Sequence, residues 1–273
     1  PFWVLLIISC CNCEITAFSL AIIIILFCFT SSVVWSSVKS NSETIIFKLV
    51  EPKYGLSMVP VELFIPSKPK RTPVPLIITQ HGSARDGGYL HKSIVQTDEY
   101  SKRLIKIGTE WGFAIAVIDA FYNKGLNSSQ KLKFPKARIY GRQVALALSE
   151  NKKLDSKNFF YTGFSYGGSQ ANMMIEKKYF GKRLSWAGIV AAEPGCTVFI
   201  KPRAFSVPLL VLKGGESHYA PKPCITMIKL YQNAGAKVEL IIFPKSNHFF
   251  SHNGYLTKGL AFNGCDENPI LIF

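Results

Sequence analysis

Residues 158–168, which read NFFYTGFSYGG, decide the fold of this chain. Residues 158–162 are mostly aromatic or β-branched, which predicts a short strand, and residues 165–180 suit a helix. Between them, residues 163–167 spell G-x-S-x-G. A turn this sharp needs glycine on both sides because neighbouring side chains would clash, and it lifts the hydroxyl of Ser165 above the sheet. The strand-turn-helix context, more than the motif alone, makes Ser165 the predicted nucleophile.

The chain after residue 40 alternates between strand-like and helix-like segments. The predicted strands are residues 44–50, 59–64, 75–80, 113–118, 158–162, 186–192, 208–212 and 238–243. The predicted helices are residues 135–151, 165–180 and 221–234. Continuous apolar strands separated by helices indicate a parallel sheet covered on both faces. We therefore predict one α/β domain over residues 41–273, in which ligands bind at the carboxyl ends of the strands.

A histidine is required as well, because a serine hydroxyl becomes a nucleophile only when a base takes its proton. His248 lies five residues past the last predicted strand. A loop there can return its imidazole over the sheet to Ser165. His252 is the second candidate, and His81 is predicted to be a structural side chain under an early turn.

The third member of the site should be an acid that holds the imidazole in the productive tautomer. It is expected between Ser165 and His248 in the chain. The acids in that interval are four glutamates, Glu176, Glu193, Glu216 and Glu239. Glu193 and Glu216 each follow a predicted strand, whereas the other two fall inside a helix or a strand. We rank Glu216 first, because it follows the strand before the final one, and keep Glu193 as the alternative acid.

Two backbone N–H groups are predicted to form an oxyanion hole. The first belongs to Tyr166, directly after the nucleophile. The second is expected in the turn of residues 81–88, where Gly82 allows close backbone approach and Ser83 is the predicted donor. Asp119 also ends a strand, but it precedes the nucleophile, so it is interpreted as structural or substrate-facing.

On these features the chain resembles the α/β-hydrolase superfamily, and within it the dienelactone hydrolase-like group. The matching features are His81-Gly82, the turn of residues 163–168, Pro194-Gly195-Cys196, residues 214–221 and Asn247-His248-Phe249. The resemblance spans about residues 55–250. It implies the α/β-hydrolase fold, with a mostly parallel central sheet and helices on both faces. It also implies hydrolysis of a small carboxylic ester or lactone through an acyl-enzyme, with no metal or organic cofactor.

The sequence departs from the pattern of this group in three places. Dienelactone hydrolases proper carry cysteine at the nucleophile, so Ser165 indicates an esterase-like relative. The acid expected three residues after the strand-ending Gly214 would fall on Ser217, next to Glu216. The 25 residues after His248 do not read as the amphipathic helix expected to close the sheet, which leaves open whether the C-terminus is complete.

Two other interpretations remain open. The displaced acid and the unusual C-terminal residues fit a catalytically inactive hydrolase fold used as a membrane-tethered binding module. A peptidase of the prolyl-oligopeptidase type is the second alternative. Such peptidases usually carry an additional domain, for which residues 41–273 leave little room.

The N-terminal segment differs in character from the rest of the chain. Residues 1–40 contain only two charges, and residues 15–38 contain none. This run is long enough to cross a bilayer, which takes roughly 20 apolar residues. We predict a signal peptide or membrane anchor in residues 1–40 and an exported domain. Because the first methionine is Met58, we also expect the natural start to lie upstream, or residues 1 to about 13 to be translated flanking sequence.

The net charge is +15, from 32 Lys and Arg against 17 Asp and Glu. A basic surface can attract nucleic acid, anionic lipid or acidic substrates. Here the lysines are scattered and no RNA-binding or zinc-finger motif accompanies them. We therefore expect a solvated basic surface and no nucleic-acid partner. The 48% hydrophobic content excludes a disordered chain.

Three of the seven cysteines, Cys196, Cys224 and Cys265, fall in the predicted domain. None has metal-site spacing with histidine, so no zinc site is expected. In an oxidising compartment two of the three can pair. We favour Cys196 with Cys224, because both would lie near the same end of the predicted sheet, and free buried thiols are the alternative.

Overall fold

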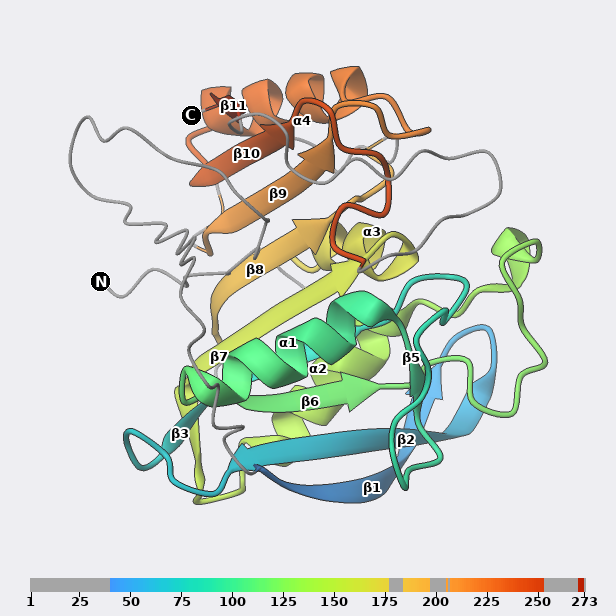
Figure 1. Ribbon diagram of the computed structural model, residues 1–273, viewed down its shortest axis with the longest axis vertical. Coiled ribbons are helices and arrows are strands. Elements are labelled where there is room, and N and C mark those ends of the chain that lie inside the picture. The colour runs from blue at the N-terminus through green and yellow to red at the C-terminus, as the bar shows by residue number, and fades with distance from the viewer. Residues whose placement is uncertain (1–39, 177–183, 197–204, 206, 253–269, 273) are drawn as a thin grey trace, which may run out of the picture.

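A computed structural model of the chain describes residues 40–176, 184–196, 205, 207–252 and 270–272. Its central sheet has nine strands in the order β1-β2-β6-β3-β7-β8-β9-β10-β11 (Figure 1). The strands are β1 (Ser40–Glu51), β2 (Gly55–Pro66), β3 (Val74–Gln80), β6 (Ala114–Ile118), β7 (Leu154–Phe164), β8 (Trp186–Ala192), β9 (Leu209–Gly214), β10 (Val238–Phe243) and β11 (Ile270–Ile272). A separate small pair is formed by β4 (Gly88–Tyr89) and β5 (Gln96–Thr97).

Six neighbouring strands of the sheet are parallel, in the order β6-β3-β7-β8-β9-β10. Antiparallel pairs flank them, β1 with β2 and β2 with β6 on one side and β10 with β11 on the other. The predicted mostly parallel sheet is therefore confirmed. The closing strand β11 was not predicted, and residues 253–269 before it lie outside the described residues.

Helices cover both faces of this sheet, as predicted (Figure 1). They are α1 (Glu99–Glu110), α2 (Ala137–Leu148), α3 (Tyr166–Met173) and α4 (Lys222–Asn233), with a short 3-10 helix η1 (Lys131–Lys133). Adjacent residues of a strand face opposite sides, and both Ile77 and Ile78 of β3 are buried. Ile77 packs with Leu104 of α1, whereas Ile78 belongs to the larger cluster that contains Val144 of α2. Burial on both faces explains why the parallel strands read as continuous apolar runs.

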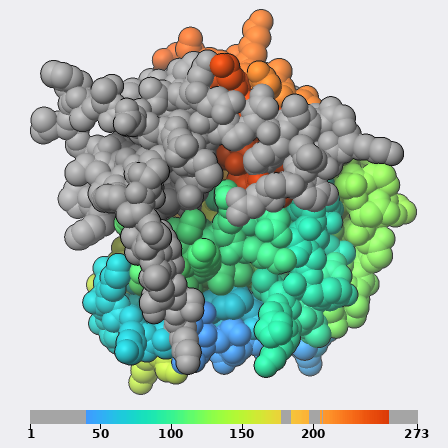
Figure 2. Space-filling view, viewed as in Figure 1, coloured from blue at the N-terminus to red at the C-terminus, as the bar shows by residue number. Residues whose placement is uncertain are grey.

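The carboxyl ends of the parallel strands form one edge, and the candidate residues follow them. These strands end at Gln80, Ile118, Phe164, Ala192, Gly214 and Phe243. The segment after β10, in red beside α1 in Figure 2, packs over this edge, since its Phe250 shares a cluster with Tyr100 of α1 and Phe164 of β7. In an open α/β sheet this edge is where ligands bind.

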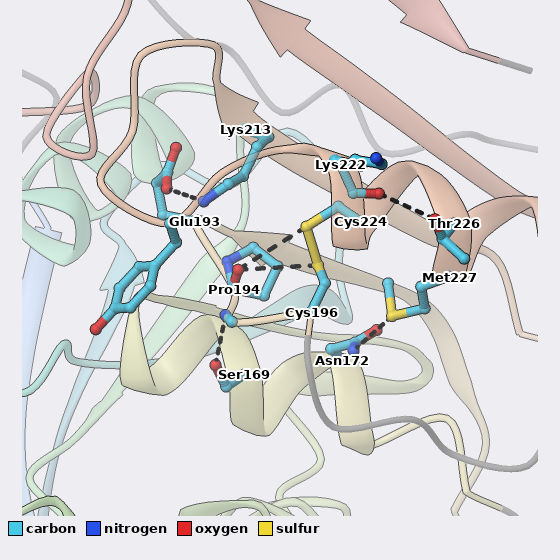
Figure 3. The surroundings of a disulfide bond; sticks show 12 residues. Ser169, Asn172, Glu193, Pro194, Cys196, Lys213, Lys222, Cys224, Thr226 and Met227 are labelled. Atoms are coloured by element: carbon cyan, nitrogen blue, oxygen red, sulfur yellow. Dashed lines mark hydrogen bonds and ion pairs between the residues drawn. A yellow bond between two sulfur atoms is a disulfide. The ribbon is translucent and has the colours of Figure 1, made fainter.

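A disulfide joins Cys196, just after β8, to Cys224 in α4 (Figure 3). The predicted pairing is confirmed, and both cysteines are buried. Cys265 and the hydrophobic segment 15–38 lie outside the described residues. Within the part of the chain that the structure describes, no helix is long and apolar enough to cross a membrane.

Candidate active site

Ser165 occupies the turn between β7 and α3. Its backbone φ is +54°, a strained value for a residue other than glycine, and such strain is common at functional sites. A Cβ on Gly163 would lie 2.5 Å from the carbonyl carbon of Gly167. A Cβ on Gly167 would lie 2.8 Å from the carbonyl oxygen of His81 and would overlap that of Gln80. The two glycines of the motif are therefore required by close backbone packing, as the sequence predicted.

His248 lies on the loop after β10 and faces the nucleophile. Its Nε2 is 3.0 Å from Oγ of Ser165. The imidazole is buried and packs against the ring of Phe164, with 5.1 Å between the ring centroids. Ser165 itself is partly exposed. The structure thus brings the predicted nucleophile and the predicted base within hydrogen-bonding distance.

Glu193 supplies the carboxylate that contacts this histidine. Its Oε2 is 3.0 Å from Nδ1 of His248, and the side chain is fully buried. Glu193 is the first residue after β8, and its backbone N–H donates to the carbonyl of Leu212 at 2.8 Å. Its φ of +51° turns the side chain back over the sheet toward the histidine. Ser165, His248 and Glu193 therefore form one continuous hydrogen-bonded chain.

The ranking of Glu216 above Glu193 is corrected by this geometry. Glu216 is exposed, and its backbone N–H donates to the carbonyl of Ser246 at 3.0 Å. The reason is the tight packing of the preceding turn, in which a Cβ on Gly214 would overlap the carbonyl oxygen of Ser246. In the residues that follow, Ser217 is buried and Glu216 is exposed. The only sequence feature that indicated Glu193 was its position directly after a predicted strand.

Two further residues, for which no sequence feature indicated a role in the site, contact the carboxylate of Glu193. Nζ of Lys213 lies 2.6 Å from Oε2, and Lys213 is fully buried at the end of β9 (Figure 3). Oγ of Ser217 donates to the same oxygen at 2.8 Å and lies 3.5 Å from Nδ1 of His248. The backbone N–H of Gly214 donates to the other oxygen, Oε1. The acid is thus held by several donors from β9 and the turn after it.

The turn after β3, in which an oxyanion donor was predicted, packs against the nucleophile turn. A Cβ on Gly82 would lie 3.1 Å from Cδ1 of Phe164. The N–H of Gly82 donates to Oδ2 of Asp98 at 2.6 Å, which anchors the turn to the start of α1. This places the segment carrying Ser83 beside the elbow, while Tyr166 begins α3. The role of these two amides in binding an oxyanion stays a prediction.

The other histidines and Asp119 have different partners. Nδ1 of His81 donates to the carbonyl of Gly82 at 2.7 Å, and burial lowers the pKa of this imidazole. Asp119 accepts from Nη1 of Arg85 at 3.0 Å, which fits the structural interpretation. Nε2 of His252 lies 3.2 Å from a carboxylate oxygen of Asp86.

The rim of the site carries His218 and Tyr219. The His218 ring centroid is 4.4 Å from that of His248, and the Tyr219 centroid is 5.4 Å from it. Partial burial and the neighbouring His248 lower the pKa of His218. Nζ of Lys131 donates to the hydroxyl of Tyr219 at 3.0 Å. Among the described residues, no group of three His, Cys, Asp or Glu side chains is arranged to hold a metal ion.

No family model matches the sequence, and no curated protein matches it significantly. The structure is similar to a Klebsiella pneumoniae protein described as a dienelactone hydrolase, at 16% identity and a TM-score of 0.56, over 78% of this chain and 92% of that one. It is similar to Thermogutta terrifontis esterase 2, solved phosphoramylated by tabun, at 12% identity and a TM-score of 0.58, over 78% and 86%. It is also similar to the Pyrococcus horikoshii acylaminoacyl peptidase, at 14% identity and a TM-score of 0.55, over 79% and 38%. The chain has the α/β-hydrolase fold, as the resemblance predicted.

Proposed function

We propose that this protein is a serine hydrolase that cleaves carboxylic ester or lactone bonds through an acyl-enzyme. The observation that carries the proposal is the hydrogen-bonded chain of Ser165, His248 and Glu193. The base lies 3.0 Å from the nucleophile and the acid lies 3.0 Å from the base. Ser165, the first of these three residues, lies in a strained turn at the carboxyl edge of the sheet, where ligands bind in open α/β sheets.

The proposed reaction uses these groups in sequence. Oγ of Ser165 attacks the ester carbonyl while Nε2 of His248 accepts its proton, and the amides of Tyr166 and Ser83 stabilise the oxyanion. His248 then returns the proton to the leaving alcohol, and the acyl group stays on the serine. Water, deprotonated by the same imidazole, attacks the acyl-enzyme and releases the acid. Glu193 holds the Nδ1–H tautomer and stabilises the imidazolium that forms in both steps.

A fluorophosphonate probe tests the proposal, because it reacts covalently with an activated serine. The full chain is treated beside Ser165→Ala and His248→Ala. The matched controls are Ser156→Ala and His91→Ala, which replace exposed residues of the same types. We expect labelling of the parent and of both controls, and none of the two site variants. A folded parent that does not react would overturn the mechanism and favour the binding-module interpretation.

Peptide hydrolysis is the second candidate, and the similarity to the acylaminoacyl peptidase favours it. The chain spans 38% of the length of that peptidase. The two functions are distinguished by comparing p-nitrophenyl esters and lactones with an N-acetylated peptide p-nitroanilide. We expect kcat/KM to be far higher for the esters and lactones than for the peptide p-nitroanilide.

We also propose that the domain is exported or attached to a membrane through residues 1–40. The disulfide between Cys196 and Cys224 supports an oxidising compartment, since cytosolic thiols are generally kept reduced. Cell fractionation combined with thiol labelling before and after reduction tests this. Recovery of the protein in the cytosol with both thiols free would contradict it.

A further inference from the structure

Lys213 is a buried charge whose position the proposed reaction does not by itself explain. Its side chain is 0% exposed, and its Nζ lies 2.6 Å from Oε2 of Glu193 and 3.2 Å from Oγ of Ser217. Removing an ammonium group from water is costly, and a buried ion pair often contributes little to stability compared with apolar residues of similar size. A hydrophobic side chain at the end of β9 would avoid that cost. The charge therefore points to a role in the site.

Three donors converge on a single oxygen of Glu193. They are Nζ of Lys213 at 2.6 Å, Oγ of Ser217 at 2.8 Å and Nδ1 of His248 at 3.0 Å. The other oxygen accepts from the N–H of Gly214. Rotation of the carboxylate about its last bond would break these contacts together. Among them Lys213 forms an ion pair with the carboxylate, and charge-assisted hydrogen bonds are roughly twice as strong as neutral ones.

Glu193 needs such support because its side chain is long and its backbone conformation is unfavourable. It lies just past β8, and a glutamate side chain must order three torsions to present its carboxylate. Its backbone φ of +51° is also unfavourable for a residue with a side chain. The supporting groups of Lys213, Gly214 and Ser217 all come from β9 and its turn. These groups therefore hold the carboxylate of Glu193 from β9, the strand adjacent to β8.

We propose that Lys213 is a positioning residue that holds the carboxylate of Glu193 oriented toward His248. The proposal deepens the proposed hydrolase function and rests on it. Because Lys213 is fully buried, it does not reach a substrate bound at Ser165. It acts through the acid on the base, and its loss should lower kcat while leaving KM nearly unchanged.

The first test is Lys213→Met, which keeps the length of the side chain and removes its charge. The matched control is Lys229→Met, an exposed lysine of α4. With p-nitrophenyl acetate we expect kcat to fall by about tenfold to a hundredfold, the range for loss of a hydrogen bond to a charged group. KM should change less than about twofold, since the bound ester does not contact Lys213. An unchanged kcat, or a loss confined to KM, would overturn the proposal.

A double-mutant cycle separates positioning from a general effect on folding. If Lys213 acts through Glu193, then adding Lys213→Met to Glu193→Gln should cause no further loss of kcat. Glu193→Gln alone leaves a buried ammonium group without its carboxylate, and Tm should fall on the order of 10 °C. The double variant should recover much of that fall. Independent, multiplicative losses of kcat would show that Lys213 does not act through Glu193.

A spectroscopic measurement keeps this inference separate from the hydrolase proposal. A histidine N–H donating to a carboxylate gives a low-field proton signal, which can be assigned here by its loss in His248→Ala. We expect this signal in the parent and its loss or marked shift in Lys213→Met. If the parent does not react with the fluorophosphonate, the proposed function fails while this signal still tests the positioning role. A signal unchanged in Lys213→Met would contradict that role.

Discussion

Glu193 and Glu216 have the same side chain and both follow a strand, yet their surroundings are opposite. Glu193 is fully buried against His248, whereas Glu216 is exposed. The difference comes from the backbone. A positive φ turns Glu193 over the sheet, and the packed turn at Gly214 directs Glu216 to solvent. Neither the positive φ of Glu193 nor the packing of the turn at Gly214 can be read from the amino-acid composition of the two loops.

Replacing each glutamate by glutamine tests the assignment at the scale of the residue. Glu193→Gln removes the charge that stabilises the imidazolium of His248 and favours the wrong tautomer, so kcat should fall on the order of a thousandfold or more. Glu216→Gln is the matched control and should leave kcat unchanged. Steady-state hydrolysis of p-nitrophenyl acetate by both variants provides the measurement. Equal losses in the two variants would count against Glu193 as the acid.

His81 gives the protein a predictable dependence of stability on pH. Burial lowers the pKa of its imidazole below the ordinary value of about 6.5. As pH falls through 6.5, the unfolded chain binds a proton at His81 before the folded protein does. Its contribution to stability is therefore fully present above that pH and is lost as pH falls, by up to about 1.4 kcal/mol per pH unit.

The measurement is the free energy of unfolding from pH 7.5 to 5 for the parent and for His81→Gln. We expect the parent to lose more stability on acidification than this variant. His91→Gln, at an exposed position, serves as the control and should follow the parent. A parent and His81→Gln variant with parallel pH profiles would show that His81 titrates normally.

At the scale of elements, the elbow depends on the contact of α3 with the end of β3. A Cβ on Gly167 would overlap the carbonyl oxygen of Gln80. Gly167→Ala should therefore displace α3 from β3, abolish fluorophosphonate labelling and lower Tm. Gly195→Ala is a suitable control, because its Cβ would meet nothing closer than Oγ of Ser169 at 3.6 Å. Labelling of Gly167→Ala at the parental rate would be inconsistent with this packing.

The disulfide links the segment after β8 to α4 across a separation of 28 residues. Closing a loop of this length stabilises the folded state by about 3.5 kcal/mol in the chain-entropy treatment. The paired variant Cys196→Ser/Cys224→Ser should accordingly melt on the order of 10 °C below the parent. Reductant should lower the Tm of the parent and leave that of the variant unchanged. Equal Tm values under oxidising conditions would mean that the bond contributes little.

At the scale of the whole molecule, the net charge of +15 is expected to produce only weak, nonspecific attraction to polyanions. Binding of a fluorescent DNA duplex, measured by anisotropy at increasing salt, tests this. We expect any binding at low salt to disappear near physiological ionic strength, because released counterions drive it. Submicromolar affinity at 150 mM salt would indicate a nucleic-acid partner and contradict the prediction.

Local sequence patterns were enough to predict the α/β architecture and the nucleophile turn. Apolar strands and helical segments have local periodicities, and the turn around Ser165 is a local motif whose glycines are required by nearby backbone. The order of serine before histidine also directed attention to His248. These features depend on residues close together in the chain, so they could be predicted without the structure.

The identity of the acid that faces His248, and of the groups that support it, depends on contacts between distant parts of the chain. Glu193, Lys213 and His248 come from the ends of three strands, and their meeting depends on strand order and on the φ of one residue. Glu216 was ranked first because it follows the strand before the final one. Both glutamates follow a strand, so their positions in the sequence do not reveal which side chain faces the histidine. Long-range packing fixes that orientation, since the turn at Gly214 is pressed against the loop carrying the histidine.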